Sequence, residues 1–209
     1  MSLVYQDYGV PDPTPPNLQY SLNDTEHWTE YEINQIIPLA KDAKVFFKAN
    51  GQNERISAPP TMGPPMIYLF VMEGKIAASG NIQYLLDDTG SRADVPSYCY
   101  NSMFSDCKSL TQAPVLPAKK LANTCYSSMF SGCTSLTQAP ALPATTLADY
   151  CYSNMFNGCT SLAQASFPNL EKERVTTDVV QNNNAFYNAA NNIETTCKDG
   201  ILVINSTSV

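Results

Sequence analysis

The sequence predicts an α/β solenoid in which each 26-residue coil holds one short strand and one short helix. The main observation is an internal repeat. Residues 99–124 match residues 125–150 at 18 of 26 positions, and residues 151–166 match residues 125–140 at 12 of 16. A period that holds over two and a half copies indicates one supersecondary unit, which stacks on its neighbours to bury a shared core.

The second observation is the apolar pattern inside each copy. Leu147, Cys151 and Met155 fall at i, i+4 and i+8, which is the apolar stripe of a helix of about two turns. We expect Gly158 to end this helix, because glycine adopts the left-handed conformation found after helix C-termini. Prolines interrupt the segment that follows, so we expect it to form only one very short strand, around residues 136–139.

The chain divides into four segments. Residues 1–16 are rich in proline and predict an extended tail. Residues 17–90 predict an antiparallel β module, because LQYSL, AKVFFKANG and MIYLFVMEGK read as strands that end at the turn pairs Asn-Asp, Asn-Gly and Glu-Gly. Residues 91–166 hold the repeats. Residues 167–209 predict a C-terminal cap, in which NNNAFYNAANNI is a degenerate repeat and TCKDGILVIN is a hairpin-like finish.

Charge and hydropathy exclude several kinds of partner. The chain of 209 residues has a net charge of −7 and no lysine or arginine cluster, which argues against binding nucleic acid or an anionic membrane surface. No stretch approaches 18 consecutive apolar residues, so we expect no membrane span. The first residues show neither the basic nor the apolar region of a signal peptide, so we expect either that the protein is not exported by this route or that a signal was removed.

Six of the seven cysteines belong to the repeat and form two columns. One column is Cys99, Cys125 and Cys151, and the other is Cys107, Cys133 and Cys159. Their spacing does not match C-x-x-C metal sites, so we expect no metal. Two interpretations remain open: a ladder of buried thiols that fill equal holes in successive coils, or one or two disulfides. Cys197 stands alone.

Two short stretches resemble parts of catalytic sites. Asp88 begins an Asp-Thr-Gly-Ser stretch like that of aspartic proteases, but a second copy of it is absent from the sequence, so only a symmetric dimer would complete the site. His27 is the only histidine and lies far in sequence from every cysteine. No phosphate-binding motif is present. We therefore expect a protein that is not an enzyme, with no cofactor.

The repeat reads L-A-x-x-C-Y-x-x-M-F-x-G-C-T-S-L-T-x-A-P-x-L-P-A-T-T, and over about residues 91–171 it resembles the leucine-rich repeats of BspA-like bacterial surface proteins of the Bacteroidales type. Residues 20–31, 45–48 and 77–82 resemble the N-terminal module of the same proteins. The resemblance implies a leucine-rich-repeat solenoid on the cell surface or outside the cell. It also implies adhesion to host proteins or to other bacteria.

Tyr100, Tyr126 and Tyr152 recur at the repeat period and are the candidate binding residues. Either their rings stack on a ligand, or they pack between coils. The function that we expect is non-enzymatic binding of a host or bacterial surface protein or glycan, through the uncharged polar face of the repeats. The alternative is a structural component of a prophage tail or spike.

Overall fold

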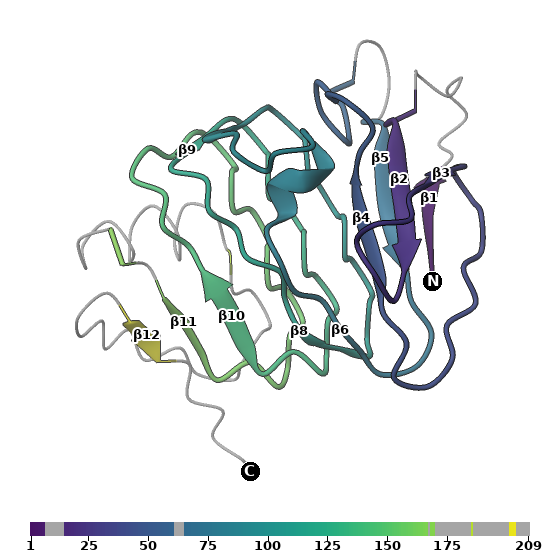
Figure 1. The fold of residues 1–209 in the computed structure, drawn as a ribbon. Helices are drawn as coiled ribbons and strands as arrows, with labels where there is room; N and C mark the ends of the chain where they lie inside the picture. Colours follow the sequence, from purple (N-terminus) through teal and green to yellow (C-terminus); the bar gives the residue numbers. More distant parts are fainter. Residues whose placement is uncertain (7–14, 61–64, 167, 170–184, 186–200, 204–209) are drawn as a thin grey trace.

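The computed structural model describes residues 1–6, 15–60, 65–166, 168–169, 185 and 201–203. In this part of the chain the structure is mostly β, built from small sheets of two or three strands (Figure 1). The single helix in the described residues is the 3₁₀ helix η1, Ile82–Leu85. The strands are β1 (Ser2–Gln6), β2 (Leu18–Leu22), β3 (Thr29–Tyr31), β4 (Val45–Ala49), β5 (Ile67–Val71), β6 (Ile76–Ala77), β7 (Asp94–Val95), β8 (Leu110–Gln112), β9 (Lys120–Leu121), β10 (Gln138–Ala141), β11 (Gln164–Ser166) and β12 (Ile201–Val203).

The N-terminal β module contains two antiparallel sheets, with strand orders β3-β2-β4 and β1-β5. The three strands predicted in this region are confirmed as β2, β4 and β5. The expected extended tail over residues 1–16 is wrong for Ser2–Gln6, which pair with β5. The physical reason is that Leu3, Val4 and Tyr5 precede the prolines and alternate onto the core, where Leu3 is fully buried.

The predicted solenoid of strand–helix coils, which the resemblance also implied, is wrong. Where a helix was expected in each copy, the chain makes a run of overlapping turns instead. In the first copy, alternate N–H groups donate to the carbonyl three residues earlier, as from Cys99 to Pro96 and from Met103 to Tyr100. An α-helix would use the carbonyl four residues earlier for every N–H group.

The remaining N–H groups of these turns bond to the next copy. The N–H of Tyr100 donates to the carbonyl of Cys125 at 2.9 Å, and the N–H of Tyr126 donates to that of Cys151 at 3.0 Å. A helix leaves no such donors free in its interior, so the copies hold one another only because the helix does not form. The bonding requires a left-handed residue at every fourth position, as at Ser102 (φ 57°) and Asp106 (φ 59°).

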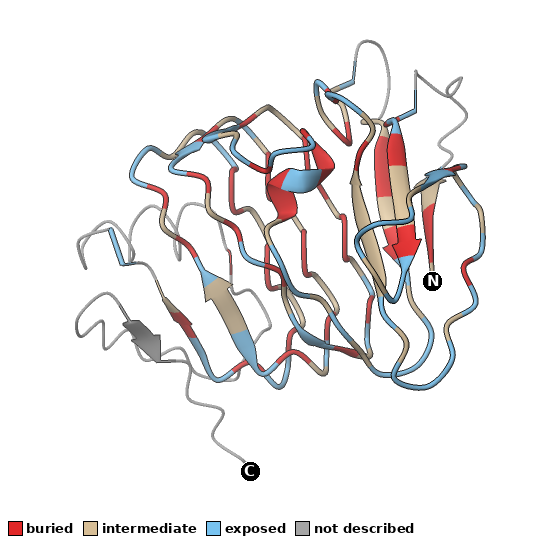
Figure 2. Cartoon of the chain, viewed as in Figure 1, coloured by how far each residue is buried: buried red, intermediate tan, exposed pale blue. Residues whose placement is uncertain are grey.

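The stacked copies share one hydrophobic core with the β module. Figure 2 shows buried residues recurring along the inside of successive turns. A column of phenylalanine rings runs through the whole core, with centroid separations of 5.3–5.6 Å. Its members are Phe47, Phe70, Phe104, Phe130 and Phe156. The β module therefore packs directly on the first copy, since Phe70 of β5 stacks on Phe104.

The C-terminal segment is described at only a few residues. β12 pairs antiparallel with β11 and so covers the edge of the last described copy. The N–H of Phe156 donates to the carbonyl of Ala185 at 2.8 Å, just as the N–H of Phe130 donates to the carbonyl of Met155 one copy earlier. Ala185 thus continues the stack, as the degenerate repeat predicted. The predicted turn at Asp199-Gly200 lies outside the described residues, as does most of 167–209.

Candidate binding surface

The three candidate tyrosines lie inside the protein. Tyr100 is 0% exposed, and Tyr126 and Tyr152 are each 1% exposed. Their rings stack in a second aromatic column, with centroids 5.8 Å apart between Tyr100 and Tyr126 and 6.2 Å apart between Tyr126 and Tyr152. No ring face reaches solvent, so the packing interpretation describes these residues and surface stacking on a ligand does not.

The start of the tyrosine column is closed by a buried amide. The hydroxyl of Tyr100 donates to Oε1 of Gln83, in η1, at 2.8 Å and also lies 3.2 Å from the carbonyl oxygen of Ile82. Nε2 of Gln83 donates in turn to the carbonyl of Arg92 at 2.9 Å. Burial raises the pKa of the Tyr100 hydroxyl well above its usual value. This network therefore joins η1 to the first copy and to the segment that leads into it.

The six repeat cysteines are free, buried thiols. In the second column, each Sγ contacts the carbonyl oxygen of a phenylalanine in the layer before it, as from Cys133 to Phe104 at 3.1 Å. Burial raises the pKa of Cys99 and of Cys159 to about 12. Because the thiolate is the nucleophile and the metal ligand, burial disfavours both roles for these side chains, which fill space in the core.

His27 and Asp24 form an exposed pair in the loop after β2. Nδ1 of His27 lies 3.1 Å from Oδ2 of Asp24. The backbone N–H groups of His27 and Glu26 donate to Oδ1 of Asp24, both at 3.0 Å, and they hold the pKa of this carboxyl well below its usual value. The carboxylate thus fixes the loop, and no cysteine lies beside the imidazole in the sequence or in this loop.

The Asp-Thr-Gly-Ser stretch forms a local turn. Asp88 is exposed, whereas its neighbour Asp87 is buried and accepts hydrogen bonds from Thr89 and Ser91. Burial alone would raise the pKa of Asp87, but these hydrogen bonds outweigh it and the pKa is lowered. The structure therefore gives Asp87 a structural role and leaves Asp88 in solvent.

The exposed polar surface of the repeats follows β8, β10 and β11, which lie along one side of the stack in Figure 1. Gln112, Gln138 and Gln164 recur on it at the repeat period, and all three are exposed. Gln138 and Gln164 are direct partners in the parallel pair β10–β11. Among the described residues, none of the three side-chain amides has a hydrogen-bond partner. We call these three residues the glutamine column.

Two tyrosines that reach the surface were missed by the sequence analysis. Tyr98 is half-buried and Tyr150 is 64% exposed. They stand two positions before Tyr100 and Tyr152 in the stretches SYCY and DYCY. The 26-residue period contains both tyrosines of each stretch, so it does not say which one faces solvent. The turns bury a pair of neighbouring residues at every fourth position, as at Cys99, Tyr100, Met103 and Phe104. This spacing is the signal that identifies Tyr100 as the buried tyrosine of its stretch.

In the part of the chain that the structure describes, no three histidine, cysteine or acidic side chains gather in a way that would hold a metal ion. No helix formed by these residues is long and apolar enough to cross a membrane. Comparisons of the chain with protein-family models, with curated proteins and with solved structures find no match.

Proposed function

We propose that this chain is a non-enzymatic binding protein, of the adhesive kind found on bacterial surfaces or outside the cell, which holds a surface protein or glycan against its repeats. The observation that carries the proposal is the glutamine column. A glutamine amide offers two donors and a carbonyl acceptor, and those of Gln112, Gln138 and Gln164 are not used within the described residues.

The spacing of this column suits an extended ligand. Gln138 and Gln164 are partners in the parallel pair β10–β11, so their amides lie about 4.8 Å apart along the stack, and Gln112 holds the equivalent position in the copy before them. Each copy is held to the next by backbone hydrogen bonds, and the surface is therefore rigid before a ligand arrives. A rigid surface loses little conformational entropy on binding.

The reactive groups that are described support binding over catalysis. The six repeat thiols are protonated and buried, and His27 is engaged by Asp24 on an exposed loop. A role in phage-particle assembly is the competing function, and it predicts a protein partner made with this chain.

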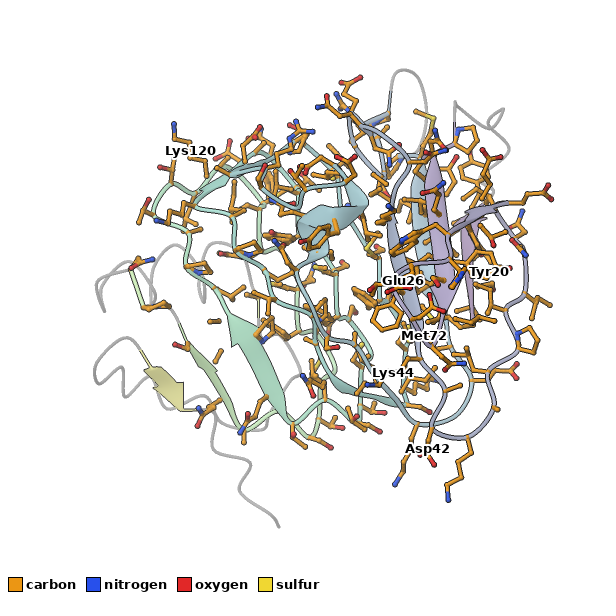
Figure 3. The ribbon with its side chains drawn as sticks, viewed as in Figure 1. Tyr20, Glu26, Asp42, Lys44, Met72 and Lys120 are labelled. Carbon is orange, nitrogen blue, oxygen red and sulfur yellow. The ribbon has the colours of Figure 1, made fainter. Side chains whose placement is uncertain are left out.

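The test is binding of the purified protein to arrays of glycans and matrix proteins, with the triple variant Gln112→Ala, Gln138→Ala, Gln164→Ala beside it. Each hydrogen bond contributes about 0.5–1.5 kcal/mol, so we expect the variant to bind at least tenfold more weakly. The matched control is Lys119→Gln with Lys120→Gln, which changes exposed residues around β9; Figure 3 shows Lys120 projecting outward there. Binding that is equal in wild type and triple variant contradicts the proposal, as does an array without any bound ligand.

A further inference from the structure

One column of residues adopts a backbone conformation that its side chains disfavour; its last member, Tyr150, is exposed, and the other two are half-buried. Tyr98, Thr124 and Tyr150 occupy equivalent positions in successive copies, with φ of 62°, 62° and 58°. Left-handed backbone suits glycine and asparagine, whereas bulky and β-branched residues rarely adopt it. Backbone strain of this kind gathers at functional sites, where the side chain serves something other than folding.

The repeat has two other columns of residues with left-handed backbone, and they show which residue types folding alone favours at such positions. Their members are small or short polar residues: Ser102, Ser128 and Asn154 in one, and Asp106, Gly132 and Gly158 in the other. The first column retains tyrosine in two copies of three at a position that takes glycine or asparagine at lower cost. A role for the tyrosine side chains in solvent accounts for this choice.

Backbone hydrogen bonds hold the column in register. The N–H of Tyr98 donates to the carbonyl of Asn123 at 3.1 Å, and the N–H of Thr124 donates to that of Asp149 at 3.0 Å. Two steps of about 4.8 Å place Tyr98 and Tyr150 about 10 Å apart along the stack. Among the described residues, neither tyrosine side chain has a hydrogen-bond or ring partner, and the smaller Thr124 lies between them.

We propose that Tyr98 and Tyr150 form a platform for an extended, neutral, β-1,4-linked glycan that runs along the stack. In such a glycan the same sugar face recurs at every second residue, close to the spacing of the two tyrosines. A tyrosine ring offers an apolar face for the sugar and a hydroxyl at its rim. The hydroxyl of Thr124 lies where the intervening sugar passes.

Charge selects a neutral glycan over an acidic one. Asp149 is exposed, and it is the only charged residue within two positions of any member of the column. The chain as a whole carries a net charge of −7, which repels polyanions. The platform rests on the proposed binding function and names its ligand class, but it uses residues separate from the glutamine column.

The test compares wild type with the double variant Tyr98→Asn, Tyr150→Asn by isothermal titration with cellohexaose and chitohexaose, which are neutral β-1,4-linked hexasaccharides. Wild type is expected to bind at least one of them, and the double variant to bind it at least tenfold more weakly, as for aromatic hot spots. Because asparagine tolerates left-handed backbone, the Tm of the variant is expected to rise by a few degrees. Weaker binding with higher stability separates a lost contact from a damaged fold.

The control variant is Ser102→Asn with Ser128→Asn, which makes the same change at a neighbouring left-handed column and should leave binding unchanged. Failure of wild type to bind either hexasaccharide overturns the platform, and so does equal binding by the tyrosine variant or tighter binding of α-linked maltohexaose. If the glutamine variant loses its array ligand while the hexasaccharides do not bind, the proposed function stands and the platform is wrong. If the tyrosine variant alone loses binding, the platform stands and the glutamine column is wrong.

Discussion

Oε1 of Gln83 accepts a hydrogen bond from the hydroxyl of Tyr100 at 2.8 Å, and both side chains are fully buried. The equivalent hydroxyl one copy later, on Tyr126, is also buried but has no hydrogen-bond partner in the described part of the chain. The same residue at the same place in the repeat therefore has opposite energetic consequences in two neighbouring copies. A satisfied buried hydroxyl is neutral or favourable, whereas an unsatisfied one carries its desolvation cost.

Tyr126→Phe is expected to stabilise the protein, and Tyr100→Phe to destabilise it. Removing the Tyr126 hydroxyl relieves a desolvation cost of about 1–3 kcal/mol, while removing that of Tyr100 leaves Oε1 of Gln83 buried without its donor, at a similar cost. Urea unfolding of the two variants beside wild type measures the difference. Two variants that shift the midpoint in the same direction would contradict this assignment.

Gly132 and Gly158 differ in what a side chain would meet. Both have left-handed backbone, with φ of 75° and 71°. A Cβ atom at Gly132 would lie 2.5 Å from Oδ1 of Asp106, whereas one at Gly158 has no neighbour closer than 3.8 Å. We expect Gly158→Ala to cost about 1 kcal/mol for its backbone alone, and Gly132→Ala to cost more.

Asp106→Ala in the Gly132→Ala background is the matched test of that difference. It removes the carboxylate that the new methyl group displaces, so it should bring the cost at Gly132 down to that at Gly158. Thermal unfolding of the four proteins checks this, and a Gly132→Ala cost that Asp106→Ala does not change would show that the carboxylate is not the obstacle.

The buried thiols predict a loss of stability in alkali. Burial raises the pKa of Cys99 and Cys107 to about 12 and that of Cys151 to about 11, well above the usual thiol value. Since the folded state holds the thiols protonated, their stabilising effect is complete below about pH 9. It falls as pH rises towards 12, because the thiols of the unfolded chain ionise first.

Each such thiol lowers the free energy of unfolding by about 1.4 kcal/mol per pH unit in that range. The urea midpoint is therefore expected to drop steeply between pH 9 and pH 11. Cys99→Ala should weaken this pH dependence by the contribution of one thiol. A midpoint that is the same at both pH values would mean that the thiols are not buried in the folded protein.

The sequence predicted the strands of the β module because their alternation is local. Leu18, Tyr20 and Leu22 alternate as in a half-buried strand, although Leu22 at the strand end is exposed, and Asn23 supplies the left-handed turn residue after them. It also predicted the buried phenylalanine and cysteine columns, since a residue repeated at a fixed period fills the same hole in each copy.

The helix was the main error, and its cause is physical. A helix stripe recurs every 3.6 residues and the observed turns every four, and over nine residues from Cys99 to Cys107 the two patterns place nearly the same side chains inward. What separates them is the direction of the backbone hydrogen bonds, which no side-chain pattern records. The same ambiguity hid the half-buried Tyr98 and the exposed Tyr150, because they stand at left-handed positions where tyrosine is not expected.

Scalar couplings across hydrogen bonds, measured by NMR on the ¹³C,¹⁵N-labelled protein, test the stacking of the copies most directly. The amide nitrogen of Tyr126 is expected to couple to the carbonyl carbon of Cys151, in the next copy, where the structure places the two groups 3.0 Å apart. A coupling from Tyr126 to the carbonyl of Ala122, four residues earlier, would instead establish the helix and contradict the stack of turns on which both binding surfaces depend.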